Sequence, residues 1–349
     1  MGILSFAWSH EQGKGEYPHR LPTITTPLWG QAPLQAIRGK LTLLLGNMDG
    51  NKCKAEEKPT NVSLATALTG MYGGKVAMKD AILAELAACE QKHDVKILYA
   101  AECGSRSWGL ANQGSDYDVR FVYVRRKDDY LRLEAVRDTI DWRLDDDLDI
   151  VGWDLSKFLR LLRNSNPSVF EWLGSGVVYA EDEAFGAVRS LARRCVSPKS
   201  LALHYLGMAS GNNRHLQASN QPGLKRYLHT IRALLACKWV VEQMTCPPLS
   251  FDELCDYGLA VELRPAIQTM VDIKRSGEES GGQDHVPELD SWISVELNNL
   301  KDAASHIEST DKLPWRDLNQ VFLELVEHTD MLLSLYPSSH GVDAGQKRV

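Results

Sequence analysis

The stretch VKILYAAECGSRSWGLANQGSDYDVRFVYV, residues 95–124, decides the fold of this chain of 349 residues. It contains two short apolar runs, 95–101 and 117–124, in which Val, Ile, Tyr and Phe are frequent. Runs of this length and composition predict β-strands, and the polar, glycine-containing segment between them predicts a loop. The residues that carry the chemistry are expected in this loop and at the start of the second strand.

Two acidic residues open the second predicted strand, in the order Asp116-Tyr117-Asp118. Residues two positions apart in a strand point to the same face, so Asp116 and Asp118 present two carboxylates within reach of the same cations. Mutual repulsion makes such a pair unfavourable unless hard divalent cations neutralise it. Mg²⁺, which prefers a few carboxylates together with water and substrate phosphates, suits this arrangement, with Mn²⁺ as the alternative.

Gly104 and Ser105 directly follow the first predicted strand. A glycine at this point lets the backbone approach a phosphate group closely, and the next turn offers its N–H groups and the Ser105 hydroxyl as donors. The Gly104-Ser105 turn and the Asp pair are therefore expected to hold opposite ends of one metal-bound nucleoside triphosphate (NTP).

A third carboxylate is needed to hold the metal ion that activates the attacking hydroxyl in a two-metal displacement. Two further apolar runs, 139–144 and 148–151, predict two more strands. Asp149 is the favoured candidate, because it alternates with apolar neighbours and its side chain can leave the core face. Asp147 has the same parity and is the second choice, and Asp145 is the third.

Each of these motifs, taken singly, also fits an ordinary structural turn. An S-D-x-D sequence often forms a solvated turn before a strand, and the acidic run 145–147 is typical of a hairpin tip. The conjunction of a strand, a Gly-Ser turn, paired Asp residues on the next strand and a later strand Asp is much rarer. It favours a catalytic site over a set of unrelated turns.

In this order, the motifs resemble the signature of the polymerase-β nucleotidyltransferase superfamily. Over about residues 78–335, the chain is similar to nucleotidyltransferases that are associated with RNA ligases in some bacteria. The segments that carry this narrower resemblance are GSRSWG, SDYDVRFVYV, LDIVGWDLSKFLRLLRNSNPSVFEWL and LKRYLHTIRALLACKW.

The resemblance implies roles for individual residues. Asp116 and Asp118 match the family's metal-binding pair, and Asp149 matches its third acidic position. Gly104 and Ser105 match the turn that contacts the nucleotide phosphates. The other candidate nucleotide-binding residues in this part of the chain are Arg106, Ser115 and Arg120.

The predicted helix 224–244 carries a basic stripe, in which Lys225, His229 and Arg232 recur at i, i+4 and i+7. Such a stripe either faces the triphosphate or decorates the solvated side of an amphipathic helix, and the pattern favours neither. By resemblance, a Lys and a Tyr from the helical part contact the phosphates, which makes Lys225 and Tyr227 candidates. Arg232 is the third candidate nucleotide ligand on this helix.

We expect an α/β fold with a small mixed β-sheet, the nucleotidyltransferase domain of residues 78–180, followed by an all-helical domain, 181–336, that closes over the nucleotide. Residues 1–77 show no sustained periodicity and are interpreted as an irregular N-terminal extension, and 337–349 as a disordered tail. Met78 directly precedes an amphipathic helix, so it is a candidate for the true start codon.

The composition and the missing motifs exclude several classes of protein. The net charge of −7 argues against a surface built throughout to coat nucleic acid and leaves room for a local basic channel. The seven cysteines are scattered and never spaced as CxxC, which favours reduced thiols in a cytoplasmic protein. No apolar run is long enough to span a membrane, and no GxxxxGK[ST], HExxH or GxSxG motif is present.

Together these features predict an Mg²⁺-dependent nucleotidyltransferase that transfers a nucleoside monophosphate from an NTP such as ATP to an acceptor hydroxyl, with release of pyrophosphate. The resemblance implies an RNA end as acceptor, in RNA repair, with RNA and an RNA ligase as partners. A protein hydroxyl and a small molecule stay open as acceptors. The alternative from another class is a non-catalytic nucleotide or RNA sensor, which a structure with Asp149 far from Asp116 and Asp118 would favour.

Overall fold

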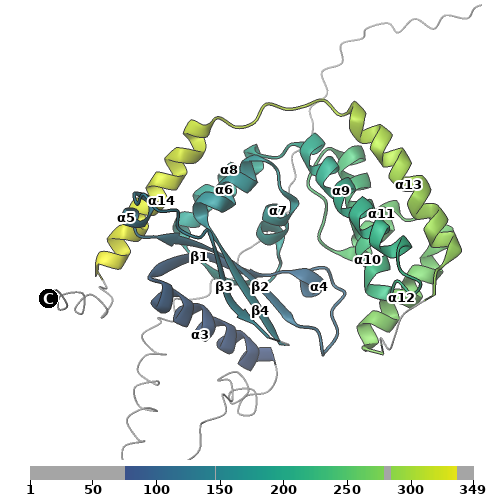
Figure 1. Cartoon of the computed structure of the whole chain (residues 1–349), viewed down its shortest axis with the longest axis horizontal. Helices are drawn as coiled ribbons and strands as arrows, with labels where there is room; N and C mark the ends of the chain where they lie inside the picture. The colour runs from purple at the N-terminus through teal and green to yellow at the C-terminus, as the bar shows by residue number, and fades with distance from the viewer. Residues whose placement is uncertain (1–74, 146, 279–283, 336–349) are drawn as a thin grey trace, which may run out of the picture. The chain divides into compact units, whose positions relative to one another are not determined.

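The computed structural model describes residues 75–145, 147–278 and 284–335, all of which belong to one compact unit of the chain. Five strands form a sheet in the order β3-β4-β2-β1-β5. Figure 1 labels β1 to β4 of this sheet. β2 and β4 are parallel, and the other neighbouring strands are antiparallel. The small mixed sheet that the sequence predicts is therefore confirmed. The strands are β1 Val95–Glu102, β2 Tyr117–Arg125, β3 Thr139–Leu144, β4 Leu148–Asp154 and β5 Val178–Glu181.

The first four strands lie close to where the sequence predicts them, whereas β5 occurs where no strand was predicted. The four residues of β5 are half-buried or exposed, so the segment has no alternation of buried and exposed positions to signal a strand. Its pairing with β1 places it at the edge of the sheet.

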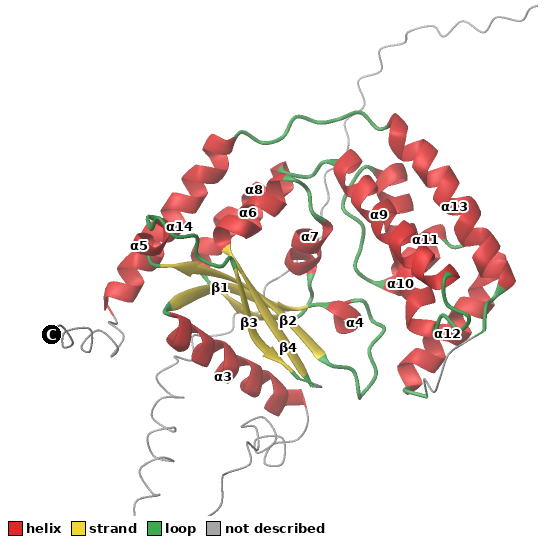
Figure 2. Cartoon of the chain, viewed as in Figure 1, coloured by secondary structure: helices red, strands yellow, loops and turns green. Residues whose placement is uncertain are grey.

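Helices cover both faces of the sheet. α3 (Lys75–His93) packs its apolar side on one face, where Val119 and Ile150 also point. Because side chains alternate along a strand, Asp118 and Asp149 emerge on the other face. That face is covered by α6 (Leu155–Arg163), α7 (Pro167–Gly174), α8 (Gly186–Arg194) and α14 (Trp315–Leu335) (Figure 2).

α6 and α7 begin at side-chain caps that the sequence signals. Asp154 accepts a hydrogen bond from the amide of Ser156 at 2.8 Å, and Asn166 accepts one from the amide of Ser168 at 3.0 Å. Pro167 occupies the first turn of α7, where its missing N–H is not needed. The caps fix the points at which the two helices leave the sheet.

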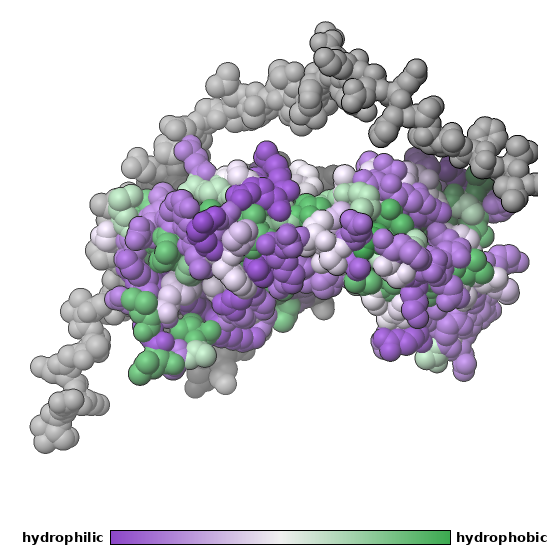
Figure 3. Space-filling view, turned by 90° about the horizontal axis from the view of Figure 1, so that it is seen from above, coloured by the Kyte–Doolittle hydropathy of each residue, from purple (hydrophilic) through white to green (hydrophobic). Residues whose placement is uncertain are grey.

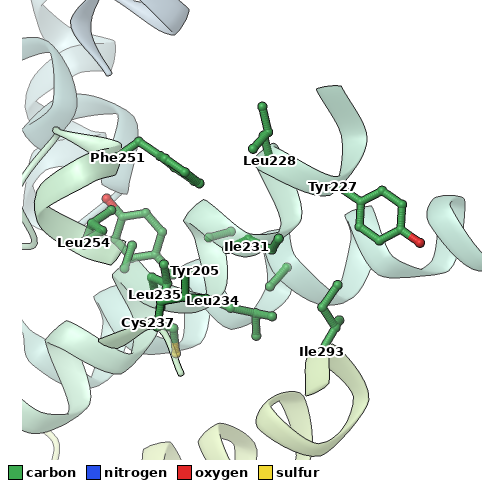
Figure 4. Packing of buried hydrophobic residues seen from close by; sticks show 14 of the residues in the cluster. Tyr205, Tyr227, Leu228, Ile231, Leu234, Leu235, Cys237, Phe251, Leu254 and Ile293 are labelled. Carbon is green, nitrogen blue, oxygen red and sulfur yellow. The ribbon is translucent and has the colours of Figure 1, made fainter. Parts of the chain in front are cut away.

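The helices of residues 198–306 form a second core (Figure 4). α10 is its central helix, because it contacts α9, α11, α12 and α13. Tyr227, Leu228 and Ile231 of α10 are buried there. The helices of this part are α9 Pro198–Gln217, α10 Leu224–Gln243, α11 Phe251–Gly258, α12 Arg264–Ser276 and α13 Pro287–His306; the short elements are α5 Lys127–Tyr130, η1 Glu183–Phe185 and η2 Val261–Leu263.

Two observations bear on the predicted domain limits. α8 and α14 follow residue 180 in the chain, yet they pack on the sheet, where Leu318 and Leu325 join its core. An amphipathic helix fits either core, so periodicity alone does not assign α14 to one of them. Residues 1–74 of the predicted extension, 1–77, lie outside the described residues, and so does the whole predicted tail, 337–349. Residues 75–77 belong to α3.

Polar residues cover most of the molecular face seen in Figure 3, and hydrophobic residues occur there in small, scattered areas. Leu131 and Leu133, in the segment between β2 and β3, are among the most exposed large apolar side chains. Within the described ranges, no helix is long and apolar enough to cross a membrane.

Candidate active site

The turn after β1 is built against Asp118. Gly104 begins the short helix α4 (Gly104–Ser107) with a φ of +60°, in the left-handed region. A Cβ atom at Gly104 would lie 1.9 Å from Oδ2 of Asp118, so only glycine fits at this position. The amide of Cys103 donates to the carbonyl oxygen of Asp118 at 2.8 Å and holds the turn on β2. The predicted phosphate turn therefore touches one of the predicted metal ligands.

β2 and β4 bring two of the three predicted carboxylates together. The strands pair in parallel with Asp118 opposite Asp149. Nη2 of Arg120 donates to Oδ1 of Asp118 at 3.0 Å and to Oδ2 of Asp149 at 2.7 Å. Nη1 of Arg120 donates to the carbonyl oxygens of Asp149 at 2.8 Å and of Val119 at 3.2 Å. Arg120, expected as a nucleotide ligand, is thus engaged by the carboxylates.

The carboxylates and the Arg120 guanidinium group shift one another's pKa values. Burial raises the pKa of Asp118, and the nearby carboxylates of Asp116 and Asp149 raise it further against the opposing effect of Arg120. Burial would lower the pKa of Arg120, but the carboxylates of Asp149 and Asp118 outweigh it and raise that pKa. An added cation would stabilise the ionised form of Asp118. Binding of a further cation beside these carboxylates is therefore electrostatically favourable.

Each strand carboxylate keeps one oxygen that Arg120 does not use. Oδ2 of Asp118 faces Gly104, and Oδ1 of Asp149 is buried without a hydrogen-bond partner among the described residues. Over the same residues, no group of three or more His, Cys, Asp or Glu side chains is already arranged to hold a metal ion. The donor set still fits Mg²⁺, which prefers hard carboxylate oxygens, and a cation would satisfy the unpaired oxygen of Asp149.

A further carboxylate, Glu102 at the end of β1, was not predicted from the sequence. Its side chain is buried, with an exposed fraction of 1% for the residue. Oε1 accepts a hydrogen bond from the amide of Asp118 at 3.0 Å, and Oε2 accepts one from the hydroxyl of Tyr179. Burial raises the pKa of Glu102, and the two hydrogen bonds oppose that rise. No local signal marks this contact, because Tyr179 belongs to the unpredicted strand β5.

Arg106 and Ser115 hold the loop that leads to Asp116. Nε of Arg106 donates to the carbonyl oxygen of Asp116 at 3.0 Å, and Nη2 donates to that of Ser115 at 2.5 Å. The guanidinium carbon of Arg106 lies 3.6 Å from the ring centroid of Tyr117. Oγ of Ser115 accepts a hydrogen bond from the amide of Asn112 at 3.0 Å. The contacts of Arg106 are those of a residue that supports the loop.

A cavity of about 140 Å³ lies beside Asp116, between this loop and the helical part. Ser105, Ser115 and Lys225, all predicted nucleotide ligands, meet there. Lys274 of α12 was not predicted, because a lysine in the last turn of a helix is typical of an ordinary C-terminal end. The lining residues are Ser105, Leu110, Asn112, Gly114, Ser115, Asp116, Lys225, Leu228, His229 and Lys274.

The basic stripe predicted on α10 is divided between two environments. Lys225 and His229 line the cavity. Burial lowers the pKa of His229 to about 4, with help from neighbouring positive charges, so its ring is neutral at physiological pH. Arg232 is 3% exposed and donates from Nη1 and Nη2 to Oε1 of Glu171, at 3.1 and 3.0 Å. Arg232 therefore joins α10 to α7, and the prediction that it lines the nucleotide site does not match the structure.

Tyr227 lies on another side of α10. Its side chain is fully buried in the helical core (Figure 4). Its hydroxyl donates to Oδ1 of Asp290 at 2.8 Å and accepts a hydrogen bond from the amide of Val286 at 3.0 Å. Residues two positions apart on a helix do not face each other, so Lys225 reaches the cavity and Tyr227 does not. The expectation that both contact the phosphates does not match this geometry.

The two alternatives for the third carboxylate lie in the turn between β3 and β4. Asp145 pairs with Arg143 and accepts hydrogen bonds from two backbone amides of its own turn. Asp147 is exposed. Only Asp149 lies opposite Asp118 in the strand register.

This chain belongs to the polymerase-β-like nucleotidyltransferase superfamily. Its mixed sheet, the glycine turn after β1 and the facing carboxylates of β2 and β4 agree with that class of protein. Residues 78–324 match the RNA repair pathway DNA polymerase beta family, and the chain is a member of that family. The uncharacterized protein YcgL of Bacillus subtilis (strain 168) is 38% identical over 254 residues, which are 72% of this chain and 97% of YcgL. The crystal structure of a nucleotidyltransferase-like protein from Exiguobacterium sibiricum 255-15 matches with a TM-score of 0.24 and 15% identity, over 72% of this chain and 81% of that one.

Proposed function

We propose that this protein is an Mg²⁺-dependent nucleotidyltransferase that transfers a nucleoside monophosphate from an NTP to an acceptor hydroxyl and releases pyrophosphate. The observation that carries the proposal is the contact between the Gly104 turn and Asp118, which shares Arg120 with Asp149. A turn without a side chain, beside carboxylate oxygens that accommodate a cation, suits a metal-bound phosphate. Membership of the RNA repair pathway DNA polymerase beta family supports the same activity.

The three aspartates would hold the metal ions, Mg²⁺ in the first place and Mn²⁺ as the alternative. When bound, such ions lower the pKa of the attacking hydroxyl and stabilise charge on the departing pyrophosphate. Arg120 orients Asp118 and Asp149 by donating to one oxygen of each, so that the second oxygen of each stays available. Gly104 and Ser105 would receive the phosphates of the NTP.

The proposed acceptor is an RNA end, with RNA and an RNA ligase as partners. The family description, which names an RNA repair pathway, supports this choice. The net charge of −7 restricts contact with RNA to a local surface. A hydroxyl group of a protein or of a small molecule could accept the nucleotide by the same metal-dependent reaction, so these acceptors are tested beside RNA. We place the reaction in the cytoplasm, and the free state of every described cysteine is compatible with that compartment.

Transfer of α-labelled nucleotides tests the proposal. Each of the four NTPs is incubated with Mg²⁺ or Mn²⁺ and a pool of short RNAs, together with the wild-type protein or Asp116→Ala. Asp116 is exposed, so its replacement is expected to leave the fold intact. Label that enters RNA only with the wild type supports the activity and identifies the base. Equal labelling by both proteins would contradict the role of Asp116, and absence of transfer to RNA, protein and small molecules would contradict the activity.

A non-catalytic nucleotide sensor is the second candidate, and Arg120 is the observation that favours it. The guanidinium group of Arg120 already neutralises part of the charge of Asp118 and Asp149, where a metal ion would bind. A sensor would bind an NTP in the presence of a divalent cation and label no acceptor. Equilibrium binding measured beside the transfer assay separates the two candidates.

A further inference from the structure

Two lysines from different helices line the helical side of the cavity. Lys225 lies in the first turn of α10, and Lys274 lies in the last turn of α12. Both positive charges lie close enough to His229, which also lines the cavity, to lower the pKa of its ring. Asp116 lines the same cavity as the two lysines. The positive charges of the two helices therefore converge on the cavity beside the proposed metal ligands.

The end of α12 is fastened to the loop that precedes Asp116. Nδ2 of Asn112 donates to the carbonyl oxygen of Lys274 at 2.9 Å. Nε of Arg275 donates to the carbonyl oxygen of Gly109 at 2.9 Å, and its Nη2 pairs with Asp252 of α11 at 2.7 Å. Contacts on two consecutive residues fix the last turn of α12, so the backbone position of Lys274 is set by the loop beside the cavity.

The size and charge of the cavity indicate which part of a nucleotide it fits. A volume of about 140 Å³ is well below the roughly 300–1,000 Å³ of pockets that enclose a whole small ligand. Two lysines line the space, and Asp116 is the acidic residue among the lining side chains. Ser105, which follows the glycine turn, adds a hydroxyl. A short polyanion meets these requirements better than an uncharged base and ribose do.

We propose that Lys274 is a phosphate-binding residue of this site and that, with Lys225, it grips the β- and γ-phosphates of the NTP from the helical side. This inference rests on the proposed function, in which Gly104 and Ser105 receive the phosphates from the sheet side. The pair of lysines selects for a triphosphate over a monophosphate, because a monophosphate carries its charge next to the ribose and does not extend to α12. The base and ribose then lie outside the cavity.

Equilibrium binding of phosphate probes with and without a nucleoside tests this role. Wild type, Lys274→Met and the control Lys301→Met, an exposed lysine on α13, are titrated in Mg²⁺ without acceptor. The probes are each NTP, its monophosphate and inorganic tripolyphosphate, which has no base. Lys274→Met removes the ammonium group and keeps the main-chain carbonyl that Asn112 binds. We expect an affinity about tenfold lower for NTP and tripolyphosphate, with monophosphate binding unchanged. Lys301→Met should match the wild type for every probe.

The outcomes separate this inference from the proposed function. Wild-type transfer activity with equal NTP affinity in Lys274→Met would overturn the inference alone. A Lys274→Met variant that loses monophosphate and triphosphate binding equally would overturn it as well, because the ammonium group would then act on the nucleoside or on the fold. Tripolyphosphate binding that depends on Lys274, in a protein that transfers nothing, would support the phosphate role and contradict the transferase. Failure of the wild type to bind NTP or tripolyphosphate would overturn both.

Discussion

The sheet side and the helical side of the cavity are built in different ways. On the sheet side, Asp118 and Asp149 lie opposite each other in paired strands and share Arg120. On the helical side, Lys225 and Lys274 come from separate helices and meet only through tertiary packing. The sheet side is determined by strand alternation and by one glycine turn, whereas the helical side requires the whole helical core. Local sequence therefore reports on the first side far better than on the second.

The largest expected effect is on the sheet side. Asp118→Asn keeps an oxygen that can accept from Arg120 but removes the negative charge that a metal ion requires. We expect nucleotide transfer to fall at least about a thousandfold. The melting temperature should stay within about 2 °C of the wild type, because burial and the nearby Asp116 and Asp149 already disfavour the ionised form of Asp118. Steady-state transfer rates and thermal unfolding measure the two effects.

The matched control for this variant is Asp128→Asn, an exposed residue of α5. It carries the same chemical change away from the cavity and should leave transfer unchanged. Full transfer activity in Asp118→Asn would contradict the metal-binding role of the sheet side.

The next largest effect is expected at the ion pair between Arg232 of α10 and Glu171 of α7. Arg232→Met leaves Glu171, whose side chain is 15% exposed, without its ion-pair partner. It also removes a guanidinium group that lies 4.0 Å from the ring centroid of Trp108. Because an uncompensated buried charge is costly, we expect the free energy of unfolding to decrease by about 3 kcal/mol. Urea denaturation measures the loss.

The pair can be separated from a nucleotide role by a double-mutant cycle. Adding Glu171→Gln to Arg232→Met should recover part of the stability, because the unpaired charge is then removed. If Arg232→Met is instead as stable as the wild type and binds NTP more than about tenfold more weakly, the result would support a nucleotide-binding role for Arg232.

A smaller effect is expected at the phosphate turn. Gly104→Ala combines a positive φ with a Cβ atom 1.9 Å from Oδ2 of Asp118. Gly223→Ala is the matched control, since its φ of +74° is similar and no atom lies within 4 Å of an added Cβ. We expect the control to lose about 1 kcal/mol of stability from backbone strain alone, and Gly104→Ala to lose about 2 kcal/mol. Transfer should fall about a hundredfold only in Gly104→Ala, because Asp118 is displaced; equal behaviour of the two variants would show that the close approach has no role.

The contrast between the two sides also explains what the sequence could and could not predict. Strand alternation placed Asp149 and Asp147 on the same face, and the apolar neighbours of Asp149 made it the first choice; the register then puts Asp149 opposite Asp118. Arg120 was recognised as part of the site, but the sequence does not reveal that its donors go to carboxylates instead of phosphates. That outcome depends on the parallel pairing of β2 and β4, which no local pattern encodes.

On the helical side, periodicity located α10 but did not assign its polar residues. Arg232 and Lys225 belong to one basic stripe in the sequence, yet Arg232 is buried against Glu171 of α7 while Lys225 reaches the cavity. Lys274 carried no signal, because its position depends on a contact with Asn112, which lies far away in the chain. Residues placed by tertiary contacts of this kind require a structure.

The smallest expected effect is a pH dependence that reports on the positive helical side. Burial and neighbouring cations, including Lys225 and Lys274, lower the pKa of His229 from 6.5 to about 4 in the folded state. Above about pH 6.5, His229 is neutral in both the folded and the unfolded state. As the pH falls from 6.5 to 4, the unfolded chain binds a proton that the folded protein does not bind. The free energy of unfolding therefore decreases over this interval.

His229→Gln removes the titrating group, so stability in the variant should depend less on pH. Between pH 7 and 4.5, we expect the wild type to lose about 1–2 kcal/mol more stability than His229→Gln, after allowance for the partial exposure of the ring. Urea denaturation at a series of pH values measures the difference. In Lys274→Met, the pKa of His229 should rise, since one of the charges that lower it is gone, and a titration followed by NMR would detect the change. Parallel stability curves for the wild type and His229→Gln would contradict the lowered pKa of His229 in the folded state.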